Sequence, residues 1–168
     1  LIERVKPTLV IEAGVWKGAS AIHMGRYLRS TRPEARLLAI DTWLGSWDFW
    51  DRLRKPGLYK ALALQHGFPT IYPQFLFNVL QEGLQEVIIP FPQTSLGACR
   101  WLKQRGVTAE LIYIDAGHDT EEVEMDLKNY FEILAPGGVI FGDDYADPQA
   151  GVAEAVECLL MKEKSPLR

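Results

Sequence analysis

The chain alternates short apolar runs with longer stretches in which apolar residues recur at helical spacing. The runs lack polar alternation, which is typical of parallel strands buried on both faces. The predicted strands are Thr8–Ala13, Leu37–Ile40, Val87–Ile89, Leu111–Ile114 and Val139–Phe141. The third run is expected to stop at the prolines of Pro90–Pro92. Five strands alternating with helices predict an α/β fold with a doubly wound parallel sheet.

Helical spacing fills most of the segments between these runs. The predicted helices are Ala19–Arg29, Phe49–Gln65, Tyr72–Leu84, Ser95–Arg105 and Gln149–Lys162, with one more between the fourth and fifth strands. The cap of the Ser95 helix is expected at Thr94 or Ser95. The connection from Thr42 to Leu84 is long and rich in aromatic residues, and connections of this length are often functional. It is expected either to cover a site or to supply core and homo-oligomer contacts.

Acidic residues stand at the ends of three predicted strands. Asp41 closes the second, Asp115 the fourth, and Asp143 and Asp144 the fifth. The carboxyl ends of parallel strands meet at one edge of a sheet, where open α/β sheets bind ligands. We therefore expect Asp115, Asp143 and Asp144 to converge in space.

The last three of these acids predict a metal site. Clustered carboxylates repel one another unless a cation neutralises them. Hard oxygen ligands without cysteine nearby favour Mg²⁺, held by Asp115, Asp143 and Asp144. The alternative is that Asp143 and Asp144 only cap the last helix or lie in a solvated loop. His118, three residues after Asp115, suits a general base, or else is a polar loop residue.

The first turn, Glu12-Ala-Gly14-Val-Trp16-Lys-Gly18-Ala-Ser20, lies where nucleotide-binding sheets carry a glycine-rich loop. The dinucleotide fingerprint needs glycine where this chain has Trp16, so NAD is disfavoured. The chain has no GxxxxGK[ST] motif, which excludes a P-loop. A plain packing turn is the alternative to a ligand loop.

This pattern resembles the ExGxxxG loop of class I S-adenosylmethionine-dependent methyltransferases, a Rossmann-like family. The resemblance implies that Asp41 binds the ribose diol, Ser20 the cofactor's carboxylate, and Thr94 and Ser95 the adenine. The complete cofactor set that it implies is Glu12, Gly14, Gly18, Ser20, Asp41, Thr94, Ser95 and Asp115.

The segments IDAGHD and LAPGGVIFGDDY, together with DTWLGS at Asp41–Ser46, are similar to macrocin/mycinamicin-type sugar O-methyltransferases. Their layout also resembles the catechol-type enzymes. The resemblance covers Leu9–Asp147 and implies transfer of a methyl group from S-adenosylmethionine to a hydroxyl of a small molecule, a sugar or a phenol. It implies Mg²⁺ on the three acids and His118 as the base. A metal-independent methyltransferase and a catalytically silent S-adenosylmethionine-binding domain are the alternatives.

The chain departs from that family at its end, because no C-terminal strand hairpin follows the last predicted helix. Residues 1–168 are expected to form one domain, either a trimmed core or a short member.

Composition and charge indicate which kinds of partner and cellular setting to expect. With 48% hydrophobic residues, a net charge of −4 and no basic run, the chain predicts a globular protein that does not bind nucleic acid. No apolar stretch approaches the ~20 residues of a membrane span, so no membrane partner is expected. Cys99 and Cys158 have no metal-ligand spacing and are expected to be packing thiols in a reducing, cytoplasmic setting.

Overall fold

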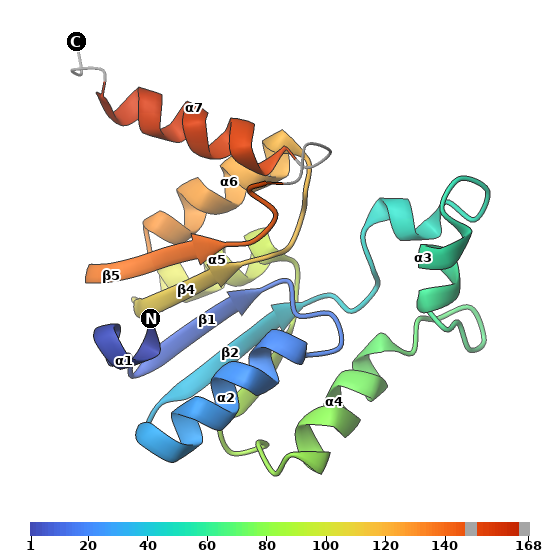
Figure 1. Ribbon diagram of the computed structural model, residues 1–168, viewed down its shortest axis with the longest axis horizontal. Helices are drawn as coiled ribbons and strands as arrows, with labels where there is room; N and C mark the ends of the chain where they lie inside the picture. The colour runs from blue at the N-terminus through green and yellow to red at the C-terminus, as the bar shows by residue number, and fades with distance from the viewer. Residues whose placement is uncertain (147–150, 165–168) are drawn as a thin grey trace.

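Five parallel strands form the centre of the protein, in the order β3-β2-β1-β4-β5 (Figure 1). The computed structural model describes residues 1–146 and 151–164. The chain runs outward from β1 to β3, returns to β4 beside β1, and continues to β5. This is the predicted doubly wound α/β sheet, and its topological switch point lies between β1 and β4. The strands are β1 (Leu9–Ala13), β2 (Arg36–Asp41), β3 (Ile88–Pro92), β4 (Ala109–Ile114) and β5 (Leu134–Gly142).

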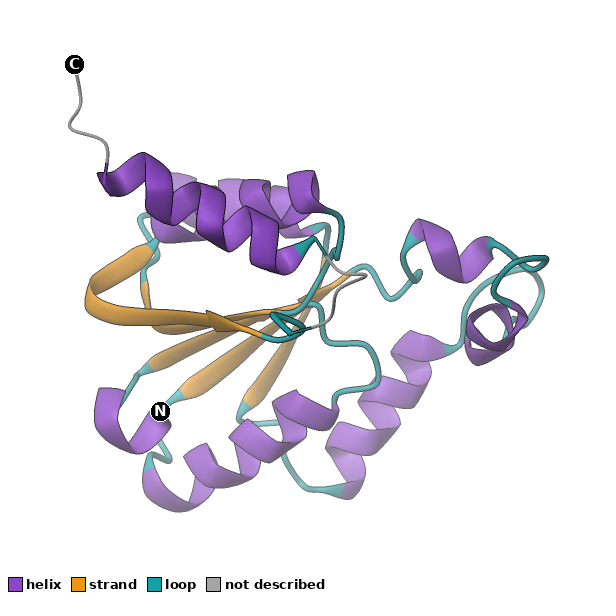
Figure 2. Ribbon diagram, turned by 45° about the horizontal axis from the view of Figure 1, so that its top comes forward, coloured by secondary structure: helices purple, strands orange, loops and turns teal. Residues whose placement is uncertain are grey.

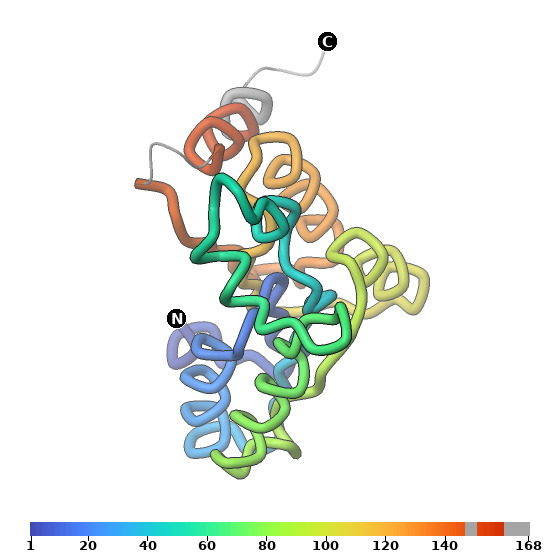
Figure 3. Tube along the Cα trace, turned by 90° about the vertical axis from the view of Figure 1, so that its right-hand side faces the viewer, coloured from blue at the N-terminus to red at the C-terminus, as the bar shows by residue number. Residues whose placement is uncertain are grey.

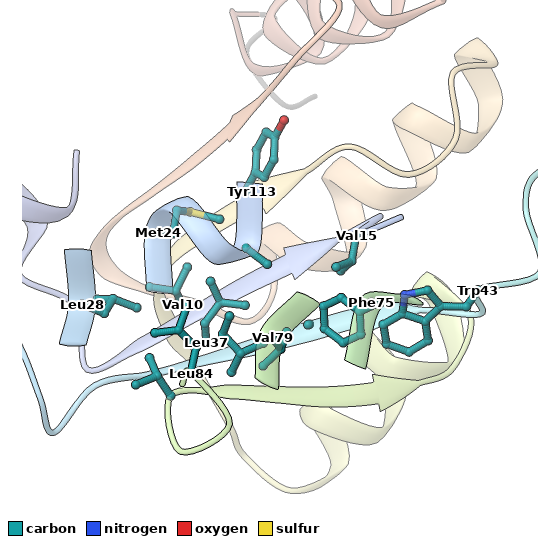
Figure 4. Close-up of a cluster of buried hydrophobic side chains, with 14 of the residues drawn as sticks. Val10, Val15, Met24, Leu28, Leu37, Trp43, Phe75, Val79, Leu84 and Tyr113 are labelled. Carbon is teal, nitrogen blue, oxygen red and sulfur yellow. The ribbon is translucent and has the colours of Figure 1, made fainter. Parts of the chain in front are cut away.

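Helices cover both faces of the sheet (Figure 2). One face carries α1 (Ile2–Val5), α2 (Ala19–Thr31) and α4 (Ile71–Gln81), and the other carries α5 (Ser95–Gln104), α6 (Thr120–Phe131) and α7 (Val152–Lys164). The apolar strand residues therefore divide between two cores. On the α2 face, Val10 and Leu37 pack with Leu28, Phe75 and Trp43 (Figure 4). On the other face, Ile11 and Ile112 pack with Leu102 and Tyr130.

The third strand was predicted too short. The structure extends β3 through Pro90 and Pro92, with Pro90 opposite Ala39 of β2. Proline has no N–H to donate, but β3 pairs only with β2 and lies at the edge of the sheet. An edge position leaves one side of the strand without a ladder, so the missing donors cost little. The fifth strand is also longer than predicted, beginning at Leu134 instead of Val139.

The single helix predicted over Phe49–Gln65 is wrong. That segment forms a 3₁₀ turn, Trp47–Trp50, and a separate six-residue helix, α3 (Pro56–Ala61). Proline inside a helix removes a hydrogen bond and clashes with the preceding turn, whereas at the first helical position it is well tolerated. Pro56 therefore begins a helix instead of lying within one. The Asp51 carboxylate accepts the N–H groups of Leu53 and Arg54 and holds the turn between the two pieces.

At the C-terminal end, α7 begins at Val152, and the predicted helical residues Gln149 and Ala150 lie outside the described residues. Among the described residues no strand follows Gly142. No helix in the described part of the chain has the length and apolar character needed to cross a membrane.

Candidate functional site

A cavity of about 720 Å³ lies at the carboxyl edge of the sheet. The segment between β2 and α4 passes in front of this edge (Figure 3). Six residues predicted from the sequence line the cavity together: Gly14, Asp41, Thr94, Ser95, Asp115 and His118. They come from the loops after β1, β2, β3 and β4, which the parallel topology brings to one place.

Asp41 organises the glycine-rich loop. Its Oδ2 accepts the N–H groups of Val15 and Trp16, each at 2.8 Å, and its Oδ1 accepts the N–H of Trp43 at 2.7 Å. The Trp43 indole N–H in turn donates to the Trp16 carbonyl at 2.9 Å. The end of β2 thereby fixes the loop after β1 from two directions, and the Asp41 carboxylate still faces the cavity.

The backbone conformation and the close packing of the loop require glycine at positions 14 and 18. Both have left-handed φ, +86° at Gly14 and +87° at Gly18. A Cβ on Gly14 would stand 1.8 Å from the Asp115 carbonyl oxygen, and one on Gly18 would stand 2.7 Å from the Phe75 ring. Trp16, also at positive φ, lines the cavity and packs on Phe49 with ring centroids 4.8 Å apart.

Glu12 and Ser20 lie beneath the loop and do not line this cavity. Glu12 is fully buried, accepts a hydrogen bond from the Ser20 hydroxyl, and leaves Oε2 without a hydrogen-bond partner among the described residues. Burial, assisted by repulsion from Asp115 and Asp41 and opposed by the Ser20 hydrogen bond, raises the pKa of Glu12 to about 8. The side chain is therefore mainly protonated at neutral pH. Ser20 lines a second cavity on the α2 face.

Asp115, His118 and Asp144 form a cluster in which one ligand atom of each lies within 4.8 Å of the others. The His118 Nε2 is 2.8 Å from Asp144 Oδ2 and 3.7 Å from Asp115 Oδ1. The neighbouring carboxylates of Asp115 and Asp144 raise the pKa of His118, against partial burial. All three side chains are partly exposed, at 33–49%. Asp115 Oδ2 also accepts the Tyr113 hydroxyl at 3.1 Å.

Asp143 is outside this cluster. Its Oδ1 accepts the N–H of Asp144 at 2.9 Å, and it lines the two smaller cavities beside β5. Asp144 has a left-handed φ of 57°, unusual for a residue other than glycine. Of the three predicted metal ligands, the structure brings two together and adds His118.

Thr94 is the cap of α5, because its hydroxyl accepts the Gly97 N–H at 3.1 Å. The hydroxyl of Ser95 donates to Asp126 Oδ1 at 2.6 Å. Asp126 was not among the site residues predicted from the sequence. Asp126 lies on α6 and is 6% exposed. Burial raises its pKa to about 6, helped by Glu122 and opposed by Ser95. The sequence carries a signal for this burial, because the helical spacing puts Asp126 on the same face of α6 as the buried residues Val123 and Tyr130.

The aromatic-rich connection serves more than one purpose. Trp43 and Phe75 are core residues stacked at 4.9 Å, whereas Phe49 lines the cavity. Trp47 is 67% exposed, and its indole N–H donates to Asp119 Oδ2 at 3.1 Å, at the start of α6. The connection thus supplies part of the core, one wall of the cavity and a contact to the start of α6.

The doubly wound sheet with its carboxyl-edge cavity is similar to the class I methyltransferase fold of several solved structures. One is an O-methyltransferase from Bacillus cereus in complex with S-adenosylhomocysteine (SAH), with 13% identity and a TM-score of 0.67. Another is the O-methyltransferase NovP, with 20% identity and a TM-score of 0.64, of which 69% is covered by 99% of this chain. A third, from Klebsiella pneumoniae and assigned as an O-methyltransferase, has 17% identity and a TM-score of 0.66.

Residues 11–145 match the family model of a methyltransferase domain, and the chain belongs to that family. Comparison with curated protein sequences finds no match. In the Klebsiella and Bacillus structures the matched part is 65% and 66% of the chain, against 98% of this one, so this chain spans about two thirds of their length.

Proposed function

We propose that the protein is an S-adenosylmethionine-dependent O-methyltransferase that methylates a hydroxyl group of a small molecule. The observation that carries the proposal is the shared cavity, in which the loop fixed by Asp41 faces Asp115 and His118. Membership of a methyltransferase domain family and the similarity of the fold to O-methyltransferase structures support it.

The cofactor half comprises the loop after β1 and the ends of β2 and β3. Asp41 would accept a ribose hydroxyl at Oδ1, which keeps a lone pair beyond its hydrogen bond from Trp43, whereas Oδ2 already accepts two backbone N–H groups. Gly14, Thr94 and Ser95 would border the cofactor within the cavity. Glu12 and Gly18 would contribute from below by setting the shape of the loop. Ser20, at the start of α2, is proposed for the cofactor's carboxylate, which would require its hydroxyl to exchange the hydrogen bond that it donates to Glu12.

The metal-and-base half comprises the ends of β4 and β5. Two carboxylates held close together, Asp115 and Asp144, fit a hard divalent cation such as Mg²⁺, and Asp143 is the adjacent third candidate. When bound, such a cation supplies Lewis acidity that favours ionisation of the acceptor hydroxyl. Ligation by His118 is the alternative, and it would favour a transition metal over Mg²⁺.

His118 is proposed as the general base. Its Nε2 would take the hydroxyl proton while the acceptor oxygen forms a bond to the methyl carbon and the carbon–sulfur bond of the sulfonium breaks, leaving SAH. The carboxylates of Asp115 and Asp144 orient the imidazole and stabilise its protonated form. The His118 loop is fixed because the His118 carbonyl accepts the Gly151 N–H at 2.7 Å.

The acceptor is proposed to be a sugar or phenol, with no nucleic acid or membrane partner, and a homo-oligomer is compatible with exposed aromatics such as Phe77. A reducing, cytoplasmic setting suits the two free thiols, Cys99 and Cys158.

Calorimetry with SAH tests the cofactor assignment. The intact protein should bind SAH, and Asp41→Ala should bind it at least ~10-fold more weakly, since a charged hydrogen-bonding group is lost. An intact, folded protein that binds no SAH would reject the assignment.

Chelation tests the metal assignment. Turnover, measured with a labelled methyl donor and a panel of sugars and phenols, should fall on addition of EDTA and return with Mg²⁺. Unchanged turnover after chelation would favour the metal-independent alternative. SAH binding without turnover of any acceptor would favour a silent binding domain.

A further inference from the structure

One buried carboxylate in the cavity has no part in the proposed reaction. Asp126 lies on α6 with 6% of its surface exposed, and it borders the same cavity as Asp41 and Asp115. A carboxylate in such a position costs folding energy unless it is hydrogen-bonded. The presence of this carboxylate on the buried side of α6 therefore calls for a role.

The side chain is fixed on one side only. Asp126 Oδ1 accepts the Ser95 hydroxyl at 2.6 Å, and that hydroxyl lies 3.3 Å from the phenolic oxygen of Tyr130. Tyr130 is fully buried and donates to the Ser95 carbonyl at 3.3 Å, which supports the network from below. Oδ2 has no hydrogen-bond partner anywhere in the described ranges 1–146 and 151–164. One carboxylate oxygen is thus held in place with acceptor capacity to spare.

The position of Asp126 in the cavity points to the part of the cofactor that it meets. Asp41 marks the ribose, and Asp115 with His118 marks the reacting end. The remaining wall is built from the start of α5 and the inner side of α6, where Leu96 and Met125 supply apolar surface beside Ser95 and Asp126. Apolar side chains next to a fixed acceptor suit a flat heterocycle that carries an N–H donor. For S-adenosylmethionine this is the adenine with its exocyclic amino group.

Resting on the proposed function, we infer that Asp126 is a specificity-determining residue whose Oδ2 accepts a hydrogen bond from the exocyclic amino group of the cofactor's adenine. A 6-oxo purine would place a carbonyl oxygen where the amino group belongs, so two acceptors would face each other without a proton between them. Sites that hydrogen-bond a ligand group discriminate strongly against analogues that lack it. Ser95 and Tyr130 are positioning residues that hold the carboxylate.

Calorimetry with two ligands tests the inference. The ligands are SAH and S-inosylhomocysteine, whose purine has a 6-oxo group and an N1–H in place of the 6-amino group and the unprotonated N1 of adenine. The wild type should prefer SAH by roughly 10- to 100-fold, the range of a hydrogen bond to a charged group. Asp126→Asn offers both a donor and an acceptor, and its preference should fall to within about 3-fold. Asp126→Ala should lose the preference as well, through weaker binding of SAH.

Glu122→Gln is the matched control, because Glu122 is an acid of the same helix that borders the same cavity. Its preference for SAH should stay as in the wild type. Circular dichroism of each variant establishes that it is folded.

Several outcomes would overturn the inference. Equal binding of both ligands by the wild type does so without any variant. A preference that survives in folded Asp126→Asn, or that Glu122→Gln abolishes, assigns the recognition elsewhere. Equal weakening of both ligands in the Asp126 variants would indicate a purely structural role. Wild type that binds neither ligand rejects the proposed function and this inference together.

Discussion

The two halves of the site are held in place in different ways. At the end of β2, both oxygens of Asp41 accept backbone N–H groups, three in all, and these bonds fix the loop around the cavity. At the ends of β4 and β5, Asp115, His118 and Asp144 are partly exposed and contact mainly one another. The first half is ordered by the fold alone. The second half brings like charges together, so any proton or cation that binds between them stabilises it.

This contrast predicts that changes in the first half act on stability and cofactor binding, and changes in the second act on turnover. Glu12 lies between the halves, since both Asp41 and Asp115 influence its pKa.

The largest expected effect is on turnover. His118→Ala should lower the rate of methyl transfer by ~10²–10⁴, the usual contribution of a general base, with SAH affinity unchanged. Single-turnover kinetics with labelled methyl donor measure the rate, and calorimetry measures the affinity. His66→Ala is the control, as His66 lies outside the cavity and should leave the rate unaltered. Wild-type turnover in His118→Ala would make His118 an ordinary loop residue.

The second expected effect is on the pH dependence of stability. The folded-state pKa of Glu12 is about 8, above its unfolded value of 4.5. Between these values the folded state binds a proton that the unfolded state does not, so stability falls as pH rises from about 5 to 8. The two pKa values differ by 3.5 units (8 − 4.5), so at about 1.4 kcal/mol per pKa unit the loss reaches at most roughly 5 kcal/mol.

Glu12→Gln cannot titrate, so urea unfolding at several pH values should give a flatter curve for the variant than for the wild type. The difference between the two curves isolates Glu12 from other groups such as Asp126. Parallel curves would mean that Glu12 is ionised in the folded protein.

The third prediction compares one carboxylate from each half. Asp41→Ala leaves three backbone N–H groups without their acceptor and should destabilise the protein by about 2–3 kcal/mol. Asp144→Asn removes one of several crowded charges and should change stability by less than about 0.5 kcal/mol. Thermal and urea unfolding in metal-free buffer compare the two. If Asp144→Asn costs as much as Asp41→Ala, the cluster is a structural element and the contrast between the halves fails.

The smallest expected effect concerns the hydrogen bond between Trp47 and Asp119. Trp47→Phe removes the indole N–H that donates to Asp119 but keeps an aromatic ring. Because Trp47 is 67% exposed, we expect a loss of stability below about 1 kcal/mol and a rise in KM without a fall in kcat. A fall in kcat alone would place Trp47 closer to the reacting groups than its exposure indicates.

The sequence by itself determined the architecture, because the strands are buried on both faces and their unbroken apolar runs are unambiguous. It also determined which acids stand at the sheet edge, since parallel strands must end on the same side. It failed where local chemistry depended on position in the sheet or helix. Pro90 and Pro92 remain in a strand because that strand is an edge, and Pro56 begins a helix instead of continuing one.

Only the tertiary structure decided which residues each carboxylate contacts. Asp143 and Asp144 are neighbours in the chain, yet Asp144 contacts His118 and Asp143 lies outside that cluster. Asp126 and Ser95, 31 residues apart, meet because α5 and α6 pack side by side on one face of the sheet. Such contacts depend on backbone turns and on helix packing, which the order of residue types along a chain does not specify.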